Sequence, residues 1–263
     1  MQNKIFSKEA FSGKNLVISG GAGDIGLEVA MEFVKAGINK IALLDNNTDQ
    51  LNFASDALKK MSCDNIKIET DLSKEASIKA AIEKIYKEEK HWDILVTSAG
   101  LYIGGTLIDY QADDWDKLMV INARSVFLLS RLMAEQMIKR GQGKIVHIGS
   151  SSTHYGTPGS GAYAASKAIV NQLTQTMAVE WGPHNIQVNT ICPTVTETKF
   201  LKFVEGDALH EKFREKLKRK IALNRLLMPS DIAPTVLFLA SEAAQFINGA
   251  VIPIDGGAKL VST

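Results

Sequence analysis

The sequence has only two cysteines, Cys63 and Cys192, among its 263 residues. They lie far apart in the chain, and neither belongs to a group of residues with metal-ligand spacing. A disulfide framework and a cysteine-based metal site are therefore not expected. We expect a protein whose thiols are reduced, that needs no metal, and that works in the cytoplasm.

Long apolar runs and an excess of one charge are missing as well. No run of about 18 apolar residues occurs, and the opening segment MQNKIFSKEAFSGK lacks the apolar stretch of a signal peptide. The 30 basic and 29 acidic residues leave a formal net charge of +1. A chain so close to neutral has no strong field for nucleic acid or for a membrane surface. We therefore expect neither of these partners.

Short, β-branched runs alternate with longer amphipathic stretches along the chain. Most runs are almost continuously apolar, which is typical of strands buried on both faces, and the alternation predicts parallel strands with right-handed crossovers. The predicted strands are residues 15–19, 40–45, 65–70, 92–98, 143–149, 186–192 and 250–255. The predicted fold is α/β, a doubly wound Rossmann-type parallel sheet of seven strands with helices on both faces. It forms a single domain over residues 1–263, with its ligand at the carboxyl ends of the strands.

The segment SGGAGDIG, residues 19–26, follows the first predicted strand and opens a helical pattern. Its glycines have the spacing G-x-x-G-x-x-G. Such a turn offers backbone N–H groups and the positive end of a helix to a phosphate. We predict that it holds a dinucleotide through Ser19, Gly20, Gly23, Asp24, Ile25 and Gly26. The alternative is a tight strand-to-helix turn that binds nothing.

Asp24 places a carboxylate where a pyrophosphate should come close. At the start of a helix a carboxylate can accept backbone N–H groups, and it is favoured by the helix dipole. That role requires the side chain to turn away from the phosphates, whereas a carboxylate that faced them would weaken binding. We expect the capping role.

Asp45 ends the second predicted strand, about 20 residues after the glycine loop. A carboxylate at this place can accept both ribose hydroxyls of adenosine and would repel a 2′-phosphate. No arginine follows it, because the next residues are Asn46 and Asn47. The sequence therefore predicts NAD(H) as the cofactor rather than NADP(H). The alternative is an exposed carboxylate without a ligand.

The segment GAYAASK places Tyr163 and Lys167 four residues apart, on one face of a helix, and Ser150 stands at the end of an earlier strand. A tyrosine titrates near pH ~10, but a lysine ammonium and a nicotinamide cation both favour its phenolate. The tyrosine can then exchange a proton with an alcohol or carbonyl while a hydride passes to or from the cofactor. The serine hydroxyl can hold the same oxygen.

A second set of residues has the same spacing. Tyr86 and Lys90 are also four apart, and Ser73 precedes them as Ser150 precedes Tyr163. Tyr86 falls in the last turn of its predicted helix, just before a strand begins, which places it at the amino edge of the sheet. We therefore predict that Tyr86 is a solvated helix residue and that Ser73 caps its helix.

Further motifs resemble the short-chain dehydrogenase/reductase family over about residues 12 to 258. They are TSAG (97–100), Asp71-Leu72, VINARSVFLL around Asn122, VNTICPTVTET (188–198) and the long segment ending in DGG. The resemblance implies that Asn122 is a fourth catalytic residue, which holds a water in the proton path to the lysine. It also implies cofactor contacts from Asp71, Leu72, Ala99, Gly100, Tyr163, Lys167, Pro193, Val195 and Thr198. Members of this family usually form homotetramers, with helices 113–139 and 160–181 in one interface.

The chain departs from the family pattern at a few positions. Short members usually have a glycine where this chain has Asp24, whereas the glycine spacing of residues 19–26 is similar to that of long members such as sugar-nucleotide epimerases. The length and the DGG ending do not fit a long member. Thr97 and Ser98 replace two asparagines, and Thr194 replaces a glycine. These changes bear on cofactor affinity more than on cofactor identity.

Substrate contacts are expected from Ser150, His154, Tyr155 and Tyr163, near Leu101 and Tyr102, and from a flexible lid at about residues 197–222. The lid contains the basic segment HEKFREKLKRK, which is either a solvated helix face or a surface that attracts an anionic substrate. The predicted function is NAD(H)-dependent interconversion of a secondary alcohol, of polyol, sugar or hydroxy acid type, and a ketone. One alternative is a 3-oxoacyl thioester reductase. Another is an NAD-binding regulator without turnover, which the intact Ser150, Tyr163 and Lys167 disfavour.

Overall fold

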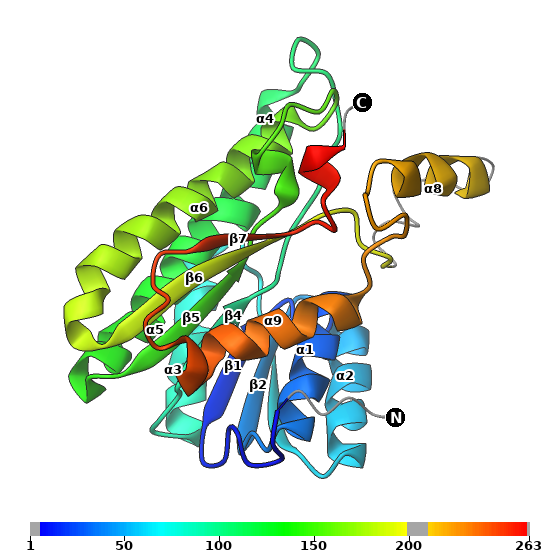
Figure 1. Cartoon of the computed structure of the whole chain (residues 1–263). Coiled ribbons are helices and arrows are strands. Elements are labelled where there is room, and N and C mark those ends of the chain that lie inside the picture. Colours follow the sequence, from blue (N-terminus) through cyan, green and yellow to red (C-terminus); the bar gives the residue numbers. More distant parts are fainter. Residues whose placement is uncertain (1–5, 199–209, 262–263) are drawn as a thin grey trace.

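The computed structural model describes residues 6–198 and 210–261, with side chains from residue 214 onwards in the second range. Within these ranges seven parallel strands form one sheet in the order β3-β2-β1-β4-β5-β6-β7 (Figure 1). The strands are β1 Asn15–Ser19, β2 Lys40–Asp45, β3 Asp64–Glu69, β4 Ile94–Thr97, β5 Gly143–Ile148, β6 Ile186–Pro193 and β7 Val251–Ile254. The predicted doubly wound sheet is confirmed. Its strand order reverses between β1 and β4, where a ligand crevice is expected.

Helices cover both faces of the sheet (Figure 1). One apolar core lies between the sheet and α1, α2 and α9, and the other lies beneath α3, α5 and α6. The helices are α1 Asp24–Lys35, α2 Thr48–Lys60, α3 Glu75–Glu88, α4 Ala112–Met119, α5 Ser125–Arg140, α6 Gly161–Trp181, α8 His210–Arg219 and α9 Pro229–Ala240. Among the described helices none is long and apolar enough to cross a membrane.

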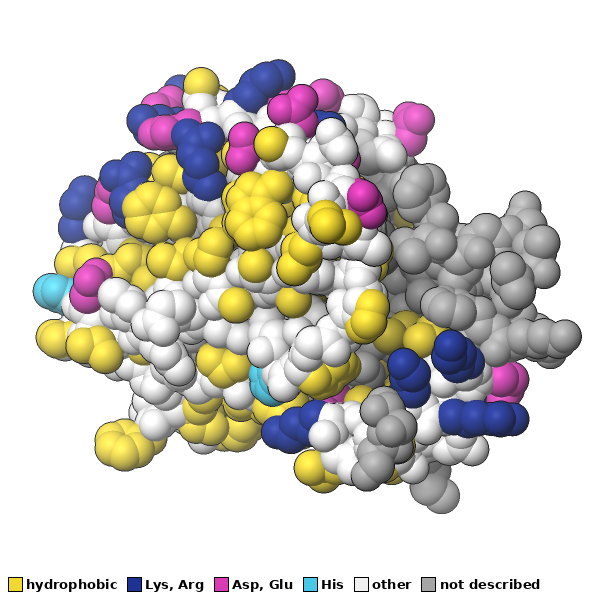
Figure 2. All heavy atoms as spheres, turned by 90° about the horizontal axis from the view of Figure 1, so that it is seen from above, with side chains coloured by type: hydrophobic (Ala, Val, Ile, Leu, Met, Phe, Trp, Pro, Cys, Tyr) yellow, Lys and Arg dark blue, Asp and Glu magenta, His cyan; other side chains and the backbone are white. Residues whose placement is uncertain are grey.

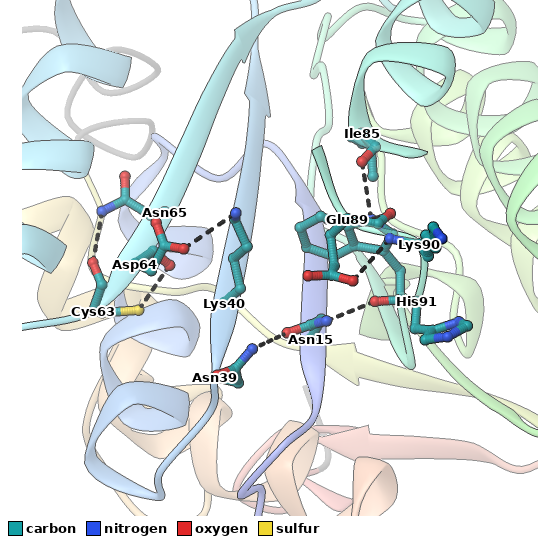
Figure 3. A network of polar contacts seen from close by, with 11 residues as sticks. Asn15, Asn39, Lys40, Cys63, Asp64, Asn65, Ile85, Glu89, Lys90 and His91 are labelled. Atoms are coloured by element: carbon teal, nitrogen blue, oxygen red, sulfur yellow. Dashed lines mark hydrogen bonds and ion pairs between the residues drawn. The ribbon is translucent and has the colours of Figure 1, made fainter. Parts of the chain in front are cut away.

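The amino edge of the sheet is closed by a network of polar contacts (Figure 3). The Asn15 side chain donates to the His91 carbonyl at 2.6 Å and accepts from the Asn39 side chain at 2.9 Å. Lys40 and Asp64 form an ion pair at 3.1 Å across β2 and β3. These contacts join β1, β2 and β3, and the loop before β4, at the edge where the strands begin.

Tyr86 and Lys90 lie near this amino edge, as predicted, but the details differ. Helix α3 ends at Glu88, so Lys90 lies beyond it and shares no helix face with Tyr86. The prediction that Tyr86 is solvated is wrong, because its ring is half-buried against the core and burial raises its pKa to about 12. Ser73 is not the N-cap either. Lys74 takes that position, and Ser73 donates to the carboxylate of Asp71.

The carboxyl edge carries a row of polar side chains. The strand register sets Ser19 beside Thr97, Thr97 beside His147 and His147 beside Thr190, on the successive strands β1, β4, β5 and β6. Residues that are paired in a parallel ladder point to the same face, so all four side chains lie on the side of α5 and α6. All four are buried. The loops that follow these residues build the candidate site.

Candidate active site

The glycine loop joins β1 to α1, and two of its glycines are required by the chain itself. Gly20 has a φ of +66°, and a Cβ there would lie 2.5 Å from the Ala99 nitrogen. A Cβ on Gly26 would overlap with the Gly20 carbonyl oxygen. By contrast, a Cβ on Gly23 would meet only the Gly20 oxygen, at 3.3 Å. A requirement for glycine at position 23 would therefore come mainly from a ligand.

Asp24 is the first residue of α1, and Gly23 is the N-cap. The carboxylate thus lies in the first helical turn, where the helix dipole favours a negative charge. The loop is closed by backbone hydrogen bonds from Gly23 to Gly20 and from Leu27 to Gly23. Whether the Asp24 carboxylate faces a phosphate stays a prediction to be tested.

Asp45 ends β2 beside the glycine loop, as the sequence predicts. Its carboxylate accepts the Ala22 N–H at 3.3 Å and the Asn47 N–H at 3.2 Å. The Thr70 N–H donates to the Asp45 carbonyl at 2.8 Å, which brings the following Asp71 and Leu72 to the same edge. Hydrogen bonds from Ser73 lower the pKa of Asp71 to about 2. A glycine cradle next to a strand-end carboxylate fits the pyrophosphate and adenosine ribose of a dinucleotide.

The loop after β4 connects this cradle to the predicted catalytic residues. The Ser98 N–H donates to the Ser19 carbonyl at 2.9 Å, and Ala99 packs against Gly20. A Cβ on Gly100 would lie 3.5 Å from Nζ of Lys167. Ala99 and Gly100 therefore stand between the glycine loop and the lysine, where a bound dinucleotide would pass.

Tyr163 and Lys167 lie on α6 and are deeply buried. Nζ of Lys167 donates to the Ile148 carbonyl at 2.9 Å, and burial lowers the pKa of Lys167 to about 8. Burial raises the pKa of Tyr163 to about 12, while a hydrogen bond with the Ser150 side chain acts in the opposite direction. At neutral pH Tyr163 holds its proton, and Lys167 is mostly charged.

Ser150 has its hydrogen-bond direction set by its neighbours. Its Oγ accepts the Ser152 N–H at 3.2 Å and the Ser152 hydroxyl at 2.9 Å. A serine oxygen has two lone pairs and one proton, so both acceptor positions are filled. The Ser150 proton is then left for Tyr163 or for an oxygen bound between the two residues. Ser150 is therefore set as a donor.

Asn122 lies in a π-helical turn, Val120–Arg124, between α4 and α5. Its side chain accepts from the Leu101 N–H at 2.8 Å and donates to the Leu101 carbonyl at 2.8 Å and to Oγ of Ser166 at 3.0 Å. It thus joins the loop after β4 to α6. Wide turns of this kind are frequent at functional sites. The water-holding role of Asn122 stays a prediction.

Among the residues expected near the substrate, Tyr102 packs against Tyr163. The Tyr102 ring lies edge-on to the Tyr163 ring with centroids 5.2 Å apart, and its hydroxyl lies 3.1 Å from Oγ of Ser160. His154 and Tyr155 follow in the Ser150 loop and are exposed. The Tyr155 hydroxyl lies 3.2 Å from Oγ of Ser151. The structure thus brings Tyr102 against Tyr163 and leaves His154 and Tyr155 exposed.

The segment after β6 starts at the same edge. Pro193 ends β6, the Thr194 N–H donates to the Ile254 carbonyl at 3.1 Å, and the Thr198 hydroxyl donates to the Thr196 carbonyl at 3.3 Å. Val195 packs near the small apolar cluster that includes Leu217. The predicted lid, residues 197–222, falls partly on residues 199–209, which lie outside the described ranges.

Helix α8 lies beyond the carboxyl ends of the strands, apart from the two helical layers (Figure 1). Figure 2 views the molecule from this side and shows Lys and Arg side chains grouped near α8. Two of these cations are paired, Arg214 with Glu197 and Lys218 with Glu215. The second pair is typical of a solvated charged helix face, whereas the first joins α8 to the segment after β6. Lys216 and Arg219 add further positive charge.

His147 was not singled out from the sequence. Its Nδ1 lies 2.8 Å from the Thr97 hydroxyl, and its Nε2 is buried without a partner in the described part of the chain. Burial, and secondarily Lys167, lower the pKa of His147 to about 3. The imidazole is therefore neutral beneath the site. Only the register of β4 and β5 brings Thr97 and His147 together, and the sequence does not show that register.

The chain belongs to the short-chain dehydrogenase/reductase family. A family model described as enoyl-(acyl carrier protein) reductase matches residues 20–259. The protein is therefore an oxidoreductase of the alcohol/ketone type. Its family binds a nicotinamide cofactor.

Three relatives illustrate the range of activities in the family. The chain is 34% identical over 247 residues to 3-oxoacyl-(acyl-carrier-protein) reductase FabG of Thermotoga maritima, covering 93% of this chain and 97% of the relative. It is 34% identical over 244 residues to NAD-dependent glycerol dehydrogenase of Listeria innocua, covering 93% of each. A gluconate 5-dehydrogenase from Burkholderia cenocepacia, solved with NADP and tartrate, is 29% identical with a TM-score of 0.89. That match covers 97% of this chain and 99% of the other.

Proposed function

We propose that this protein is an NAD(H)-dependent dehydrogenase that interconverts a secondary alcohol and a ketone, with Tyr163 as the general acid and base. The observation that carries the proposal is the convergence of three groups at the carboxyl edge of the sheet. Tyr163 is hydrogen-bonded to Ser150, Lys167 is buried one helical turn further on, and both lie beside the loop that continues to the glycine cradle.

Each of the proposed catalytic residues has a different role in the reaction. In ketone reduction Tyr163 gives its proton to the carbonyl oxygen, and the Ser150 hydroxyl donates a hydrogen bond to the same oxygen. Lys167 stabilises the phenolate that Tyr163 becomes, because an ammonium close to a phenolate favours the charged form. Alcohol oxidation runs the same proton transfer backwards. When bound, the nicotinamide supplies or accepts the hydride. Asn122 is proposed to hold a water in the path that returns a proton to Lys167.

Asp45 supports NAD(H) rather than NADP(H). Its carboxylate stands beside Ala22 of the glycine loop, where it would accept the ribose hydroxyls and repel a 2′-phosphate. The residues that would hold the dinucleotide are Ser19, Gly20, Gly23, Asp24, Ile25, Gly26, Asp45, Asp71, Leu72, Ala99, Gly100, Tyr163, Lys167, Pro193, Val195 and Thr198. Among the relatives, one is named NAD-dependent and another was solved with NADP, so the preference rests on Asp45 itself.

The proposed substrates are polyols, sugars or hydroxy acids. The relatives named glycerol dehydrogenase and gluconate 5-dehydrogenase support this class. The hydroxyl groups of Ser150, Tyr102 and Tyr155 and the His154 ring can bind substrate hydroxyls around Tyr163. A 3-oxoacyl thioester is the second candidate substrate, and the relative FabG favours it. Asp45 disfavours it, because reductive biosynthesis usually draws on NADPH.

A panel assay tests this function. Purified protein is mixed with NAD and, in turn, with polyols, sugars, hydroxy acids and simple secondary alcohols, and NADH absorbance is followed. In a parallel assay, a 3-oxoacyl thioester is mixed with NADH or NADPH to test the second candidate function. Turnover of a polyol or hydroxy acid that is lost in Tyr163→Phe supports the proposal. Turnover of the thioester alone would assign the second function, and no turnover in any arm would favour an NAD-binding protein without catalysis.

We further propose a cytoplasmic homotetramer. Large apolar side chains are exposed on the outer faces of two long helices, Phe127 of α5 and Ile169 and Val179 of α6. Phe246, after α9, is exposed as well. Exposed apolar side chains on these helices suit contacts with further copies of the chain. Light scattering on the purified protein measures the mass, and a monomer would contradict the proposal. Both cysteines are free, which fits a reducing compartment.

A further inference from the structure

The loop that carries Ser150 is held from two sides by groups outside the proposed catalytic set. The Thr153 hydroxyl donates to the Ser150 carbonyl at 2.8 Å and accepts from Nδ2 of Asn171 at 3.1 Å. Asn171 lies on α6, four residues after Lys167, so it belongs to the face that carries the lysine. On the other side, the Ser150 N–H is hydrogen-bonded to the sulfur of Cys192 on β6.

The side chains of Thr153 and Asn171 are hydrogen-bonded to each other, and both also have a hydrogen bond with Cys192. A threonine hydroxyl has one proton, and Thr153 gives it to the Ser150 carbonyl, so Asn171 must present its N–H groups to Thr153. The Asn171 oxygen then faces Cys192, whose Sγ lies 3.7 Å away. A Cβ on Gly149 would lie 3.2 Å from this oxygen, so the strand end and the amide are packed together.

Thr153 also meets Nδ1 of His154 at 3.1 Å. The hydroxyl of Thr153 thus contacts a second residue that we expect to bind substrate.

We propose that Asn171 is a positioning residue that acts on Ser150 through the Thr153 hydroxyl, and that the pair keeps Ser150 Oγ directed at the reacting oxygen. The role rests on the proposed dehydrogenase function. Neither side chain would touch substrate or cofactor. Each sets the path of the backbone at Ser150, and a shift of about 1 Å in a catalytic group can slow a reaction roughly 100-fold.

The role predicts a specific kinetic pattern. Ser150 acts on the reacting oxygen, so loss of the support should lower kcat for the alcohol. Cofactor affinity should stay within about twofold, because Asp45 and the glycine loop lie in the other half of the site. A general loss of folding would instead lower both together.

The test uses Thr153→Val, which keeps the shape and removes the hydroxyl, and Thr153→Ser, which keeps the hydroxyl. Asn171→Ala removes the second member, and Lys84→Ala, at an exposed position on α3, is its control. We expect Thr153→Val and Asn171→Ala to lower kcat about tenfold or more. Thr153→Ser and the control should stay within about twofold. The double variant should be no slower than Thr153→Val alone, because both residues act through one hydroxyl.

Amide hydrogen exchange of residues 151–155 gives a readout that does not need turnover. Exchange in this loop should quicken in Thr153→Val and Asn171→Ala and stay slow in Thr153→Ser, with Tm and NADH affinity unchanged. The positioning role would be overturned by a wild-type kcat in Thr153→Val or by unchanged amide exchange in this loop. It would also be overturned if the decreases in kcat of the two single variants multiplied in the double variant. Lack of turnover by the wild-type protein would overturn the proposed function instead, and exchange would then decide the loop support alone.

Discussion

The ammonium of Lys167 donates a hydrogen bond to the main-chain carbonyl of Ile148, at 2.9 Å. This contact joins α6 to the end of β5, two residues before Ser150. Lysine, tyrosine and serine are thereby held as one unit, although they come from two elements. The lysine is only 3% exposed, so its charge is poorly screened, and we propose that it stabilises the phenolate form of Tyr163.

Lys167→Met tests that electrostatic role. The variant keeps the length of the side chain and removes the charge, so the Tyr163 phenolate loses its stabilising cation. We expect kcat for alcohol oxidation at neutral pH to fall by about 100-fold or more. Part of the activity should return at alkaline pH, where Tyr163 gives up its proton without help. A pH–rate profile measures this, and a profile with the wild-type shape and height would contradict the assigned role.

The cofactor preference depends on Asp45. We expect kcat/KM with NAD to exceed that with NADP by at least about tenfold, which requires only ~1.4 kcal/mol. Asp45→Ala should narrow the gap, mostly by improving NADP, because the repulsion of a 2′-phosphate is removed. Steady-state kinetics with both cofactors measure the ratio. Equal use of NAD and NADP by the wild-type protein would reject NAD specificity.

The glycine loop offers a test of the ligand itself. Alanine at position 23 is tolerated by the chain, with only the Gly20 oxygen within 4 Å of the new Cβ, so the fold should persist. NADH binding should nevertheless weaken strongly, because the methyl group blocks the close approach of the phosphates. Fluorescence titration with NADH, together with a thermal melt, separates the two effects. Unchanged affinity would show that Gly23 is not the point of close approach.

Asp24 is tested in the same titration. If the carboxylate accepts backbone N–H groups in the first turn of α1, the variant Asp24→Asn should bind NADH about as well as the wild type. Asp24→Ala should then cost roughly 1 kcal/mol of stability with little change in affinity. Tighter binding by Asp24→Asn, strongest at low salt, would instead place the charge against the pyrophosphate.

His147 should make the protein sensitive to acid. Its pKa falls from 6.5 to about 3 on burial, so between these values the unfolded chain binds a proton that the folded protein does not. Stability is therefore complete above pH 6.5 and is lost as the pH falls. From neutrality to about pH 5 the loss from this residue is about 2 kcal/mol. His147→Asn, which keeps a partner for Thr97, should reduce that loss in urea unfolding. An equal acid loss in the variant would contradict this account.

The sequence predicts well what depends on local spacing. Tyr163 and Lys167 share a helix face because they are four residues apart, and Asp45 reaches the glycine loop because β2 lies beside β1 in the predicted fold. The apolar runs also gave each strand to within a few residues.

What the sequence misses depends on contacts between distant segments. Tyr86 is half-buried because α3 packs against Met133 of α5, which no local pattern reveals. Thr153 meets Asn171 across 18 residues, and both are ordinary polar residues by themselves. Such pairs could be found only with the register of β5 and β6 and the placement of α6 in hand.

The variant Tyr163→Phe tests whether Tyr163 exchanges the proton with the substrate. The ring still packs against Tyr102, and only the proton donor is lost. Turnover of the alcohol found in the panel and the affinity for NADH are measured in the same preparation, with Tyr86→Phe as the matched control. We expect no detectable turnover in Tyr163→Phe, NADH affinity within a few fold of wild type, and wild-type kinetics in Tyr86→Phe. Full activity in Tyr163→Phe, or loss of activity in Tyr86→Phe, would contradict this expectation.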